Sequence, residues 1–370
     1  MSASPNRADW QVRQAGAGPA LKERARRLAQ TPWIGAVVAI LVLLAIDLVK
    51  DPSYLTVTYN SDTGRLFGNV IDIMRAAAPV LMISVGMLLV IATAGIDLSV
   101  GSVMAAAGAV SMQFLSAAAR PESLSSALTA LALALALGAT LGAVNGLLVT
   151  VVGLQPFIST LIMMLGARGL AKVITGGQNA RATSAPFRFI SNGYVGGLPF
   201  VFLLAVGIVV IVALVCRGTA LGMMIEAVGL NPVAARLAGL RARGLILITY
   251  VISGFLAAVA GVFATATVMV VDVSNTGYLL EMDAILAVVI GGTSLAGGKF
   301  SIAGATVGAL LIATLDKTVL FLGVPASATP AFKAAVIIAL CVLQSQSTRS
   351  WLASLRRGVG RMPEARSKEA

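Results

Sequence analysis

Long apolar runs with very few charged residues recur along this chain, and they restrict its fold more than any other feature. A helix that crosses a lipid bilayer needs about 20 mainly apolar residues. We place ten candidate membrane segments, near residues 33–49, 70–94, 100–119, 127–152, 155–174, 198–216, 244–271, 282–296, 301–322 and 329–346. The first segment is at the short limit. The eighth is shorter still and rich in glycine, so it is a candidate for a segment that re-enters the membrane without crossing it.

These runs predict helices rather than strands. Backbone N–H and C=O groups inside lipid must bond within a helix or around a closed barrel. Barrel strands would appear as segments of about 10 residues in which apolar and polar side chains alternate. The apolar runs of this chain show no such polar face, so they do not fit a barrel. Of the 370 residues, 58% are hydrophobic and 11% are charged, whereas soluble domains carry about 25% charged residues. We therefore expect an all-α integral membrane protein with about ten transmembrane helices.

Basic residues cluster in three polar segments, which predicts the topology. Residues 1–32 hold six Lys and Arg, 217–243 hold four and 349–370 hold six, together 16 of the 27 in the chain. Basic flanks stay on the cytoplasmic side. Six candidate spans separate the first two clusters and four separate the last two. Both numbers are even, so one topology places all three clusters in the cytoplasm. A total of eight spans instead of ten would be equally compatible with this placement. We expect cytoplasmic tails at 1–32 and 348–370 around a transmembrane domain at 33–347, and this placement of the charge argues against nucleic acid as a partner.

The remaining sequence offers little that could serve an enzyme. The chain contains no histidine, which excludes His-ligated metal sites and His-based catalytic triads. The polar, turn-rich loops 50–69 and 175–197 are expected outside the membrane, and they are too short for an independent enzyme domain. The glycine-rich stretch 291–300 is similar to a nucleotide-binding loop, but Phe300 stands where Ser or Thr must meet magnesium. We expect a hinge there, and a non-catalytic protein with no metal and no other cofactor.

A polar break at residues 94–102 (AGIDLSVGS) joins two apolar runs and contains Asp97 beside Ser99. A charge at bilayer depth costs about 2.5–3.5 kcal/mol, so Asp97 should face protein or water. Transporters use such glycine-rich breaks to expose backbone groups to a solute. The alternative is that Asp97 caps the next helix from a turn at the membrane surface. Both interpretations remain open.

A second polar group consists of Asp272, Glu281 and Asp283 around Asn275, at the outer surface or in a vestibule. Ionised carboxylates form strong hydrogen bonds and suit sugar hydroxyls. The alternative is a solvated loop, which we favour for Asp272. A different function is also open: a secondary transporter of a small polar solute, in which Asp97, Glu281 and Asp283 relay protons or sodium ions.

The third feature lies in the basic loop 217–243, where Asn231 and Pro232 predict a helix start and Gly239 predicts its end. The result is a short amphipathic helix, with Arg236 pointing away from the apolar side. Such a helix either lies on lipid or docks into the groove of a partner protein. Its apolar side consists of Val233, Leu237 and Leu240.

These stretches resemble the permeases of bacterial ABC importers of the ribose and galactofuranose type, and the likeness runs from about residue 33 to 347. It looks closest to the galactofuranose branch. The residues that carry it are 64–68 (GRLFG), 71–73 (IDI), 75–79 (RAAAP), 91–101 (IATAGIDLSVG), 155–157 (QPF), 219–223 (TALGM), 226–231 (EAVGLN) and 283–292 (DAILAVVIGG).

The resemblance implies a type II-like ABC importer permease fold in the bacterial inner membrane. It further implies a second permease subunit (identical or a sister chain), two cytoplasmic ATP-binding subunits that dock on the loop helix, and a periplasmic binding protein. The cargo would be a monosaccharide such as ribose, galactose or galactofuranose, and the partner subunits would hydrolyse ATP. Coupling residues would be Glu226, Gly229, Asn231, Ala234, Ala235, Arg236 and Gly239. Candidates for the translocation pathway are Asp97, Ser99, Asn145, Phe157, Asn275, Glu281 and Asp283.

Overall fold

The structure is a computed structural model that describes residues 33–61, 64–325 and 327–344, so both predicted basic tails lie outside the described residues. Each of the ten predicted segments contains a helix, and further short helices lie in the connections. A π-helical turn, η3 (Leu148–Val152), extends α5. The helices are α2 (Ile34–Lys50), α3 (Asn69–Ala92), α4 (Val100–Ala117), α5 (Leu124–Leu147), α6 (Pro156–Ile174), α7 (Ala185–Asn192), α8 (Phe200–Gly218), α9 (Leu221–Leu230), α10 (Pro232–Leu237), α11 (Ala242–Val268), α12 (Leu280–Ile290), α13 (Ile302–Phe321) and α14 (Thr329–Gln344).

Seven of the described helices are long and apolar enough to cross a membrane, namely α3, α4, α5 with η3, α6, α8, α11 and α13. Helix α2 has 17 residues and α14 has 16, just below the usual crossing length. Helix α12 has 11 residues, so it rises about 16 Å and cannot cross a hydrocarbon layer of about 30 Å alone. The glycine-rich residues expected to continue it form turns and loop instead.

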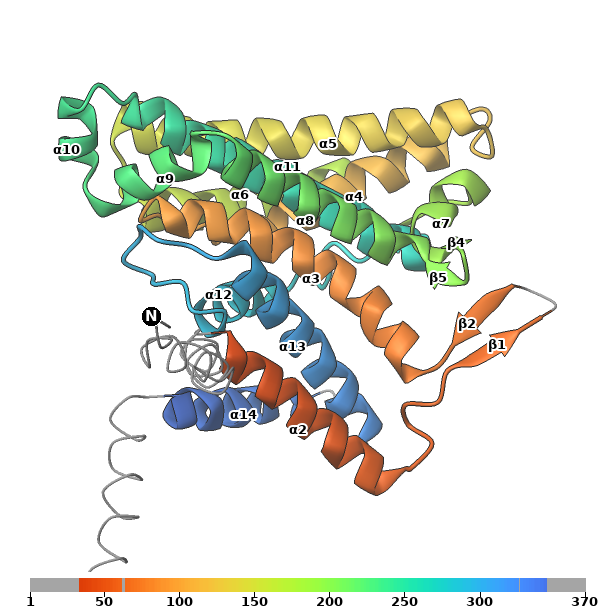
Figure 1. The fold of residues 1–370 in the computed structure, drawn as a ribbon. Coiled ribbons are helices and arrows are strands. Elements are labelled where there is room, and N and C mark those ends of the chain that lie inside the picture. Colours follow the sequence, from red (N-terminus) through yellow and green to blue (C-terminus); the bar gives the residue numbers. More distant parts are fainter. Residues whose placement is uncertain (1–32, 62–63, 326, 345–370) are drawn as a thin grey trace, which may run out of the picture.

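Helix α3 lies at the centre of the fold (Figure 1). Over its most apolar window 78% of the residues are buried within the chain, compared with 22% for α8. A helix that is apolar on all sides is stable when neighbours surround it, and α3 packs against α11 and α13. In Figure 1, α5 runs along one side of the molecule while α2 and α14 form the opposite side. Helix α8 therefore presents most of its apolar surface outward, as a lipid-facing helix does.

Helices α5 and α11 meet along a row of glycines on α5, Gly138, Gly142 and Gly146, which are spaced four residues apart. A Cβ atom added at Gly138 would lie 2.5 Å from the carbonyl oxygen of Gly254, and one at Gly142 would lie 2.3 Å from that of Tyr250. These distances leave no room for a side chain, so the two backbones are in direct contact, as small residues permit in membrane helix pairs.

The two ends of the molecule carry different elements (Figure 1). One end carries α9 and α10. The other carries α7 and three antiparallel strand pairs, which is where the polar loops 50–69 and 175–197 lie. The strands are β1 (Thr58–Asn60) with β2 (Arg65–Phe67), β3 (Ala180–Arg181) with β6 (Val270–Val271), and β4 (Tyr194–Val195) with β5 (Leu198–Pro199).

Candidate translocation pathway and coupling segment

Residues 93–99 interrupt the path between α3 and α4, and Asp97 lies inside this break with only 1% of its surface exposed. Its Oδ1 accepts hydrogen bonds from the backbone N–H of Ser99 (3.0 Å) and from the Ser99 hydroxyl (2.6 Å). Its Oδ2 accepts from the hydroxyl of Ser253 on α11 (2.7 Å). Asp97 therefore fixes Ser99, the residue that directly precedes α4, from a position buried within the protein.

The hydrogen-bond network of Asp97 continues into two more helices. The side-chain amide of Asn145 on α5 donates to the Ser99 hydroxyl (2.9 Å), and the Ser159 hydroxyl on α6 donates to Asn145 Oδ1 (3.2 Å). The structure thus joins three predicted residues, Asp97, Ser99 and Asn145, in one buried network. Phe157, two residues before Ser159, is 50% exposed and takes no part in it.

A second break, residues 272–279, lies between β6 and α12 and contains Asn275. The Asn275 side chain donates to Asp272 Oδ2 (2.8 Å), and the backbone N–H groups of Ser274 and Asn275 donate to Oδ1 (3.0 Å each). The hydrogen bond from the Asn275 side chain and, as a smaller effect, the one from its backbone N–H hold the pKa of Asp272 below the usual range of a carboxyl. The side chains of Asp272 and Asn275 therefore shape the turn itself.

Arg168 on α6 holds the same break from the side. Its guanidinium donates to the carbonyl oxygens of Val273 (3.2 Å) and Thr276 (2.6 Å). Sequence reasoning missed this residue. An arginine within an apolar segment is itself a signal, because such a charge must find a partner inside the protein.

The second break touches the first turn of α4, directly after the first break. A Cβ atom at Gly101 would lie 2.1 Å from the carbonyl oxygen of Gly277 and 2.5 Å from Glu281 Oε2. Glu281 is 8% exposed, and its Oε2 atom has no hydrogen-bond partner. A buried acceptor without a partner is uncommon and marks Glu281 as a group able to bind a hydroxyl.

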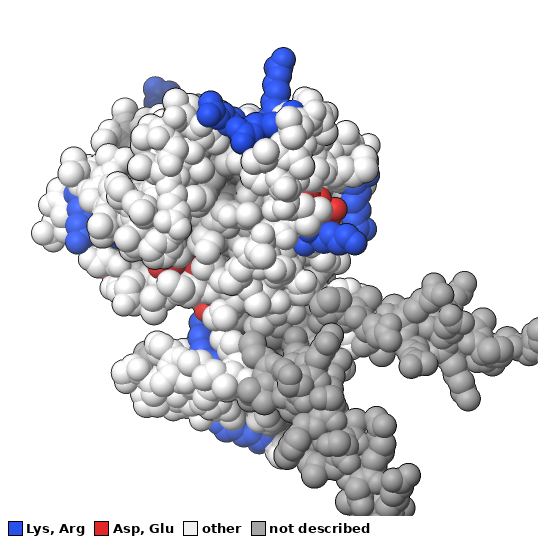
Figure 2. All heavy atoms as spheres, turned by 90° about the vertical axis from the view of Figure 1, so that its left-hand side faces the viewer, with Lys and Arg blue, Asp and Glu red and all other residues white. Residues whose placement is uncertain are grey.

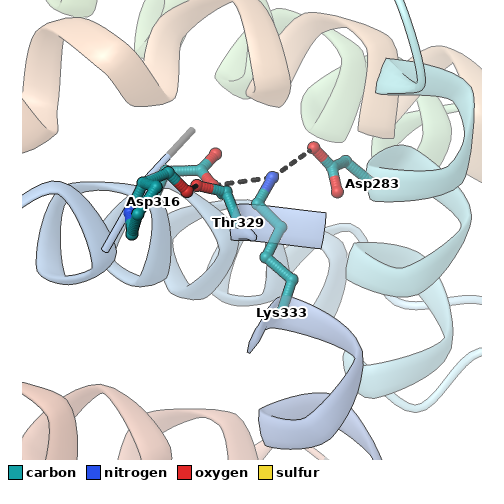
Figure 3. Close-up of polar contacts among 5 residues, drawn as sticks. Asp283, Asp316, Thr329 and Lys333 are labelled. Carbon is teal, nitrogen blue, oxygen red and sulfur yellow. Dashed lines mark hydrogen bonds and ion pairs between the residues drawn. The ribbon is translucent and has the colours of Figure 1, made fainter. Parts of the chain in front are cut away.

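Asp283, two residues along α12 from Glu281, faces a different neighbour (Figure 3). Lys333 on α14 lies between two carboxylates, with its Nζ 3.0 Å from Asp283 Oδ2 and 2.6 Å from Asp316 Oδ1 on α13. Asp283 is thus the partner of a lysine and not a free acceptor. Lys333 and Asp316 were missed in the sequence, although a lysine in an apolar run is a recognisable signal.

The predicted loop helix is present as α10. Asn231 Oδ1 accepts from the backbone N–H groups of Val233 and Ala234 (3.0 Å each), and Gly239 follows the helix with a φ of +85°. Val233 is 55% exposed and Leu237 is 87% exposed, whereas Leu240 is half-buried and packs against a small apolar cluster that includes Ala235, so two of the three residues of the predicted apolar side are open.

Exposed basic side chains lie on and next to α10. Figure 2 views the molecule from the α10 end and shows Lys and Arg side chains at several separate places near the edge of this face. Arg236, Arg241 and Arg243 are among the exposed residues.

Other residues predicted for coupling lie on the buried side of α10 or in the preceding helix, α9. Ala235 is 4% exposed, and a Cβ atom at Gly229 would lie 1.8 Å from the carbonyl oxygen of Ala92 at the end of α3. Glu226 is half-buried and lines a pocket of about 270 Å³ between α8 and α9. These three residues are buried or half-buried, whereas Ala234 and Arg236 are exposed.

Comparison with known proteins places these features in context. Residues 69–342 match the family described as "Branched-chain amino acid transport system / permease component". The chain is 50% identical to the fructose import permease protein FruF of Bifidobacterium longum, over 90% of this chain and 93% of the relative. It is 41% identical to the galactofuranose transporter permease protein YtfT of Escherichia coli, over 90% and 95%, and 36% identical to the ribose import permease protein RbsC of Escherichia coli, over 85% and 94%. No solved structure matches.

Proposed function

Because the chain belongs to the family of branched-chain amino acid transport system permease components, and its relatives include sugar import permeases, we propose that it is the membrane-spanning subunit of an ABC importer for a monosaccharide. One observation carries this proposal: three relatives named for sugar import are 36–50% identical to the chain over 85–90% of its length. The protein is a multi-pass protein of the inner membrane.

The cargo is a monosaccharide that moves from the periplasm to the cytoplasm. The named cargoes of the three relatives are a ketohexose, a galactose in its furanose form and a pentose, so small neutral sugars are the shared class. Neutral sugars need hydrogen-bonding groups and no counter-charge. Of the predicted pathway residues, Glu281 is the best candidate for a sugar contact, because Oε2 is free to accept from a hydroxyl. Asp97, Ser99, Asn145, Asn275 and Asp283 support the pathway by holding its breaks and helices in place.

The topology proposed is that of a type II-like permease with ten membrane segments and both termini in the cytoplasm, in which 33–347 forms the transmembrane domain. Placing α10 in the cytoplasm puts the loops 50–69 and 175–197 outside, in agreement with their position at the opposite end of the molecule (Figure 1). The short helix α12 lies in the eighth segment, at 282–296, and with 11 residues it enters the membrane without crossing it alone.

The partners proposed are a second permease subunit, two cytoplasmic ATP-binding subunits and a periplasmic sugar-binding protein. An ATP-binding subunit docks on the exposed apolar side of α10, which lacks any cover among the described residues, and Arg236 lies beside this contact. Alternating access requires that each conformation be stabilised by a ligand that binds it preferentially. The loaded binding protein and the ATP-bound subunits are those ligands, and this chain does not hydrolyse ATP itself.

Proteoliposomes test the proposal. The chain is reconstituted with its ATP-binding subunits, and uptake of labelled fructose, ribose and galactose in its furanose form is measured with the binding protein outside and ATP inside. Uptake should require both. Uptake by the chain alone, driven by a sodium or proton gradient, would show instead that it is an ion-coupled secondary transporter.

A further inference from the structure

A basic pocket of about 680 Å³ opens at the end of the molecule that carries the strand pairs, far from α10. It lies between β2, the start of α3, α7 and the β4–β5 turn, and its volume is in the range of small-molecule sites. Its wall includes Arg65, Arg75, Arg188, Tyr194 and Phe189. None of the functions discussed above uses this pocket.

The three arginines of the basic pocket have no acidic partner among the described residues. Arg75 donates to the Tyr194 hydroxyl, and its Nε is buried without a partner. The guanidinium groups of Arg65 and Arg75 lie 5.0 Å and 5.4 Å from the centre of the Tyr194 ring, which holds them in place. Three guanidiniums around one cavity, none of them ion-paired among the described residues, suit an anion with several oxygens, such as a phosphate group. A carboxylate does contact the pocket wall, since that of Glu122 accepts from the backbone N–H of Ala185 (2.7 Å).

An apolar groove begins beside the basic pocket and runs along α8. It has a volume of about 310 Å³ and is lined only by apolar residues and glycine, among them Val195, Phe200, Gly207 and Ile211. The rings of Phe189 in the pocket and Phe200 in the groove lie 5.4 Å apart, so the two cavities share this wall. Ile211 is 60% exposed, on a helix that presents most of its surface to lipid.

We propose that the basic pocket and the groove together bind one anionic phospholipid, with its phosphate among the arginines and an acyl chain along α8. Phe200 is the first residue of α8, so the pocket lies at the depth where this span enters the bilayer and lipid headgroups reside. A free anion would use the arginines but not the groove. An acidic segment of a soluble protein would not reach along a membrane helix.

Native mass spectrometry of the purified chain in detergent, titrated with phosphatidylglycerol or phosphatidylcholine of identical chains, measures the binding. Each guanidinium that pairs with the phosphate contributes about fivefold in affinity, the upper end of the range for an exposed ion pair. We therefore expect the triple variant Arg65→Gln/Arg75→Gln/Arg188→Gln to weaken phosphatidylglycerol binding about a hundredfold, and Arg188→Gln alone about fivefold. The control Arg181→Gln removes an exposed charge at the same end, outside the pocket, and should change binding less than twofold.

A groove variant tests the acyl chain separately. A Cβ atom at Gly207 would meet nothing within 4 Å, so Gly207→Trp fills the groove without a clash in the backbone. It should weaken phosphatidylglycerol binding at least tenfold. Gly169 on α6 is equally open, and Gly169→Trp is the matched control that should leave binding unchanged.

Three outcomes would overturn the proposal. In the first, phosphatidylcholine binds as tightly as phosphatidylglycerol, or the triple variant retains full binding. In the second, Gly207→Trp has no effect and millimolar inorganic phosphate displaces the lipid, which makes the pocket a free-anion site. In the third, the arginine variants keep the lipid but lose stimulation by the binding protein, which makes it a protein-docking site. Lipid binding is measured without transport, so failure of sugar uptake leaves this test intact.

Discussion

Substitutions at Asp97 best distinguish two roles for this residue: holding the break 93–99 by hydrogen bonds, or relaying an ion through its negative charge. Asparagine preserves its shape and keeps an acceptor towards Ser99, while its amide can donate to Ser253. We expect Asp97→Asn to retain most of the uptake, because the break 93–99 keeps its bonds. Asp97→Ala strands buried donors and should destabilise the protein by about 2–3 kcal/mol. Thermal unfolding in detergent, together with uptake, measures both variants.

The control for Asp97 is Ser84→Ala on α3, since the Ser84 hydroxyl is buried and has no hydrogen-bond partner. Its removal should leave the melting temperature unchanged or raise it. If Asp97→Asn is stable but abolishes uptake, the negative charge itself is required and the structural role is insufficient.

Arg168 offers a second prediction at this scale. Arg168→Met removes the donors to the carbonyl oxygens of Val273 and Thr276, so the break 272–279 loses its support from α6. We expect at least a tenfold loss of uptake, partly restored by Arg168→Lys, and faster hydrogen exchange in this break. The nearby Lys172→Met, near the end of the same helix, is the control. Unchanged exchange in Arg168→Met would contradict the positioning role.

Local sequence patterns predicted some of these residues and missed others for a physical reason. Asp97 stands out because it is a charge beside glycine within an apolar run. Ser253 and Lys333 contact their partners across 156 and 50 positions of sequence, and no periodicity reports such a contact. Phe157 was selected from a resemblance, and the structure does not bring it to the buried network.

The exposed apolar side of α10 is the element on which coupling can be tested. Leu237→Glu places a charge at its most open apolar position and should reduce association of the ATP-binding subunits at least tenfold, as should Arg236→Glu. Both residues are exposed, so melting temperatures should change little. Co-purification of the subunits measures the effect, and full retention in both variants would remove the docking role.

Gly229→Ala serves as the contrasting control for α10. Its added methyl would collide with the backbone of Ala92, so we expect loss of stability as well as loss of coupling. A variant that loses coupling through misfolding is thereby distinguished from one that loses it at the docking surface.

Element boundaries were predicted well where hydrophobicity decides them. The apolar runs and helices agree within a few residues at most ends, because lipid demands a complete helix wherever it surrounds the chain. The short strands and α7 were not expected, since the outer loops show only a turn-rich composition. The glycine-rich end of the eighth segment formed a loop, as its helix-breaking residues indicate.

The arrangement of α12, α13 and α14 depends on the ion triad at Lys333. Removing one partner of a buried pair leaves an uncompensated charge and costs about 3–5 kcal/mol. Since Asp316 is one third exposed, we expect about 3 kcal/mol for Lys333→Met. Lys317→Met, whose pair with Asp72 is more exposed, should cost about 0–1 kcal/mol. Thermal unfolding measures both.

Adding Asp283→Asn to Lys333→Met removes one of the stranded charges and should restore part of the lost stability. If the double variant is less stable than Lys333→Met, the triad does not act through charge balance, and packing of the lysine stem would account for the loss.

The glycine row between α5 and α11 has a mechanical consequence for the whole molecule. At Gly138, Gly142 and Gly254 the main chain of one helix lies against the other helix, so neither helix can slide or roll past its partner without a clash. We therefore expect the two helices to move as one rigid body during transport. We expect the bending that admits and releases cargo to fall in the non-helical segments on either side of this pair.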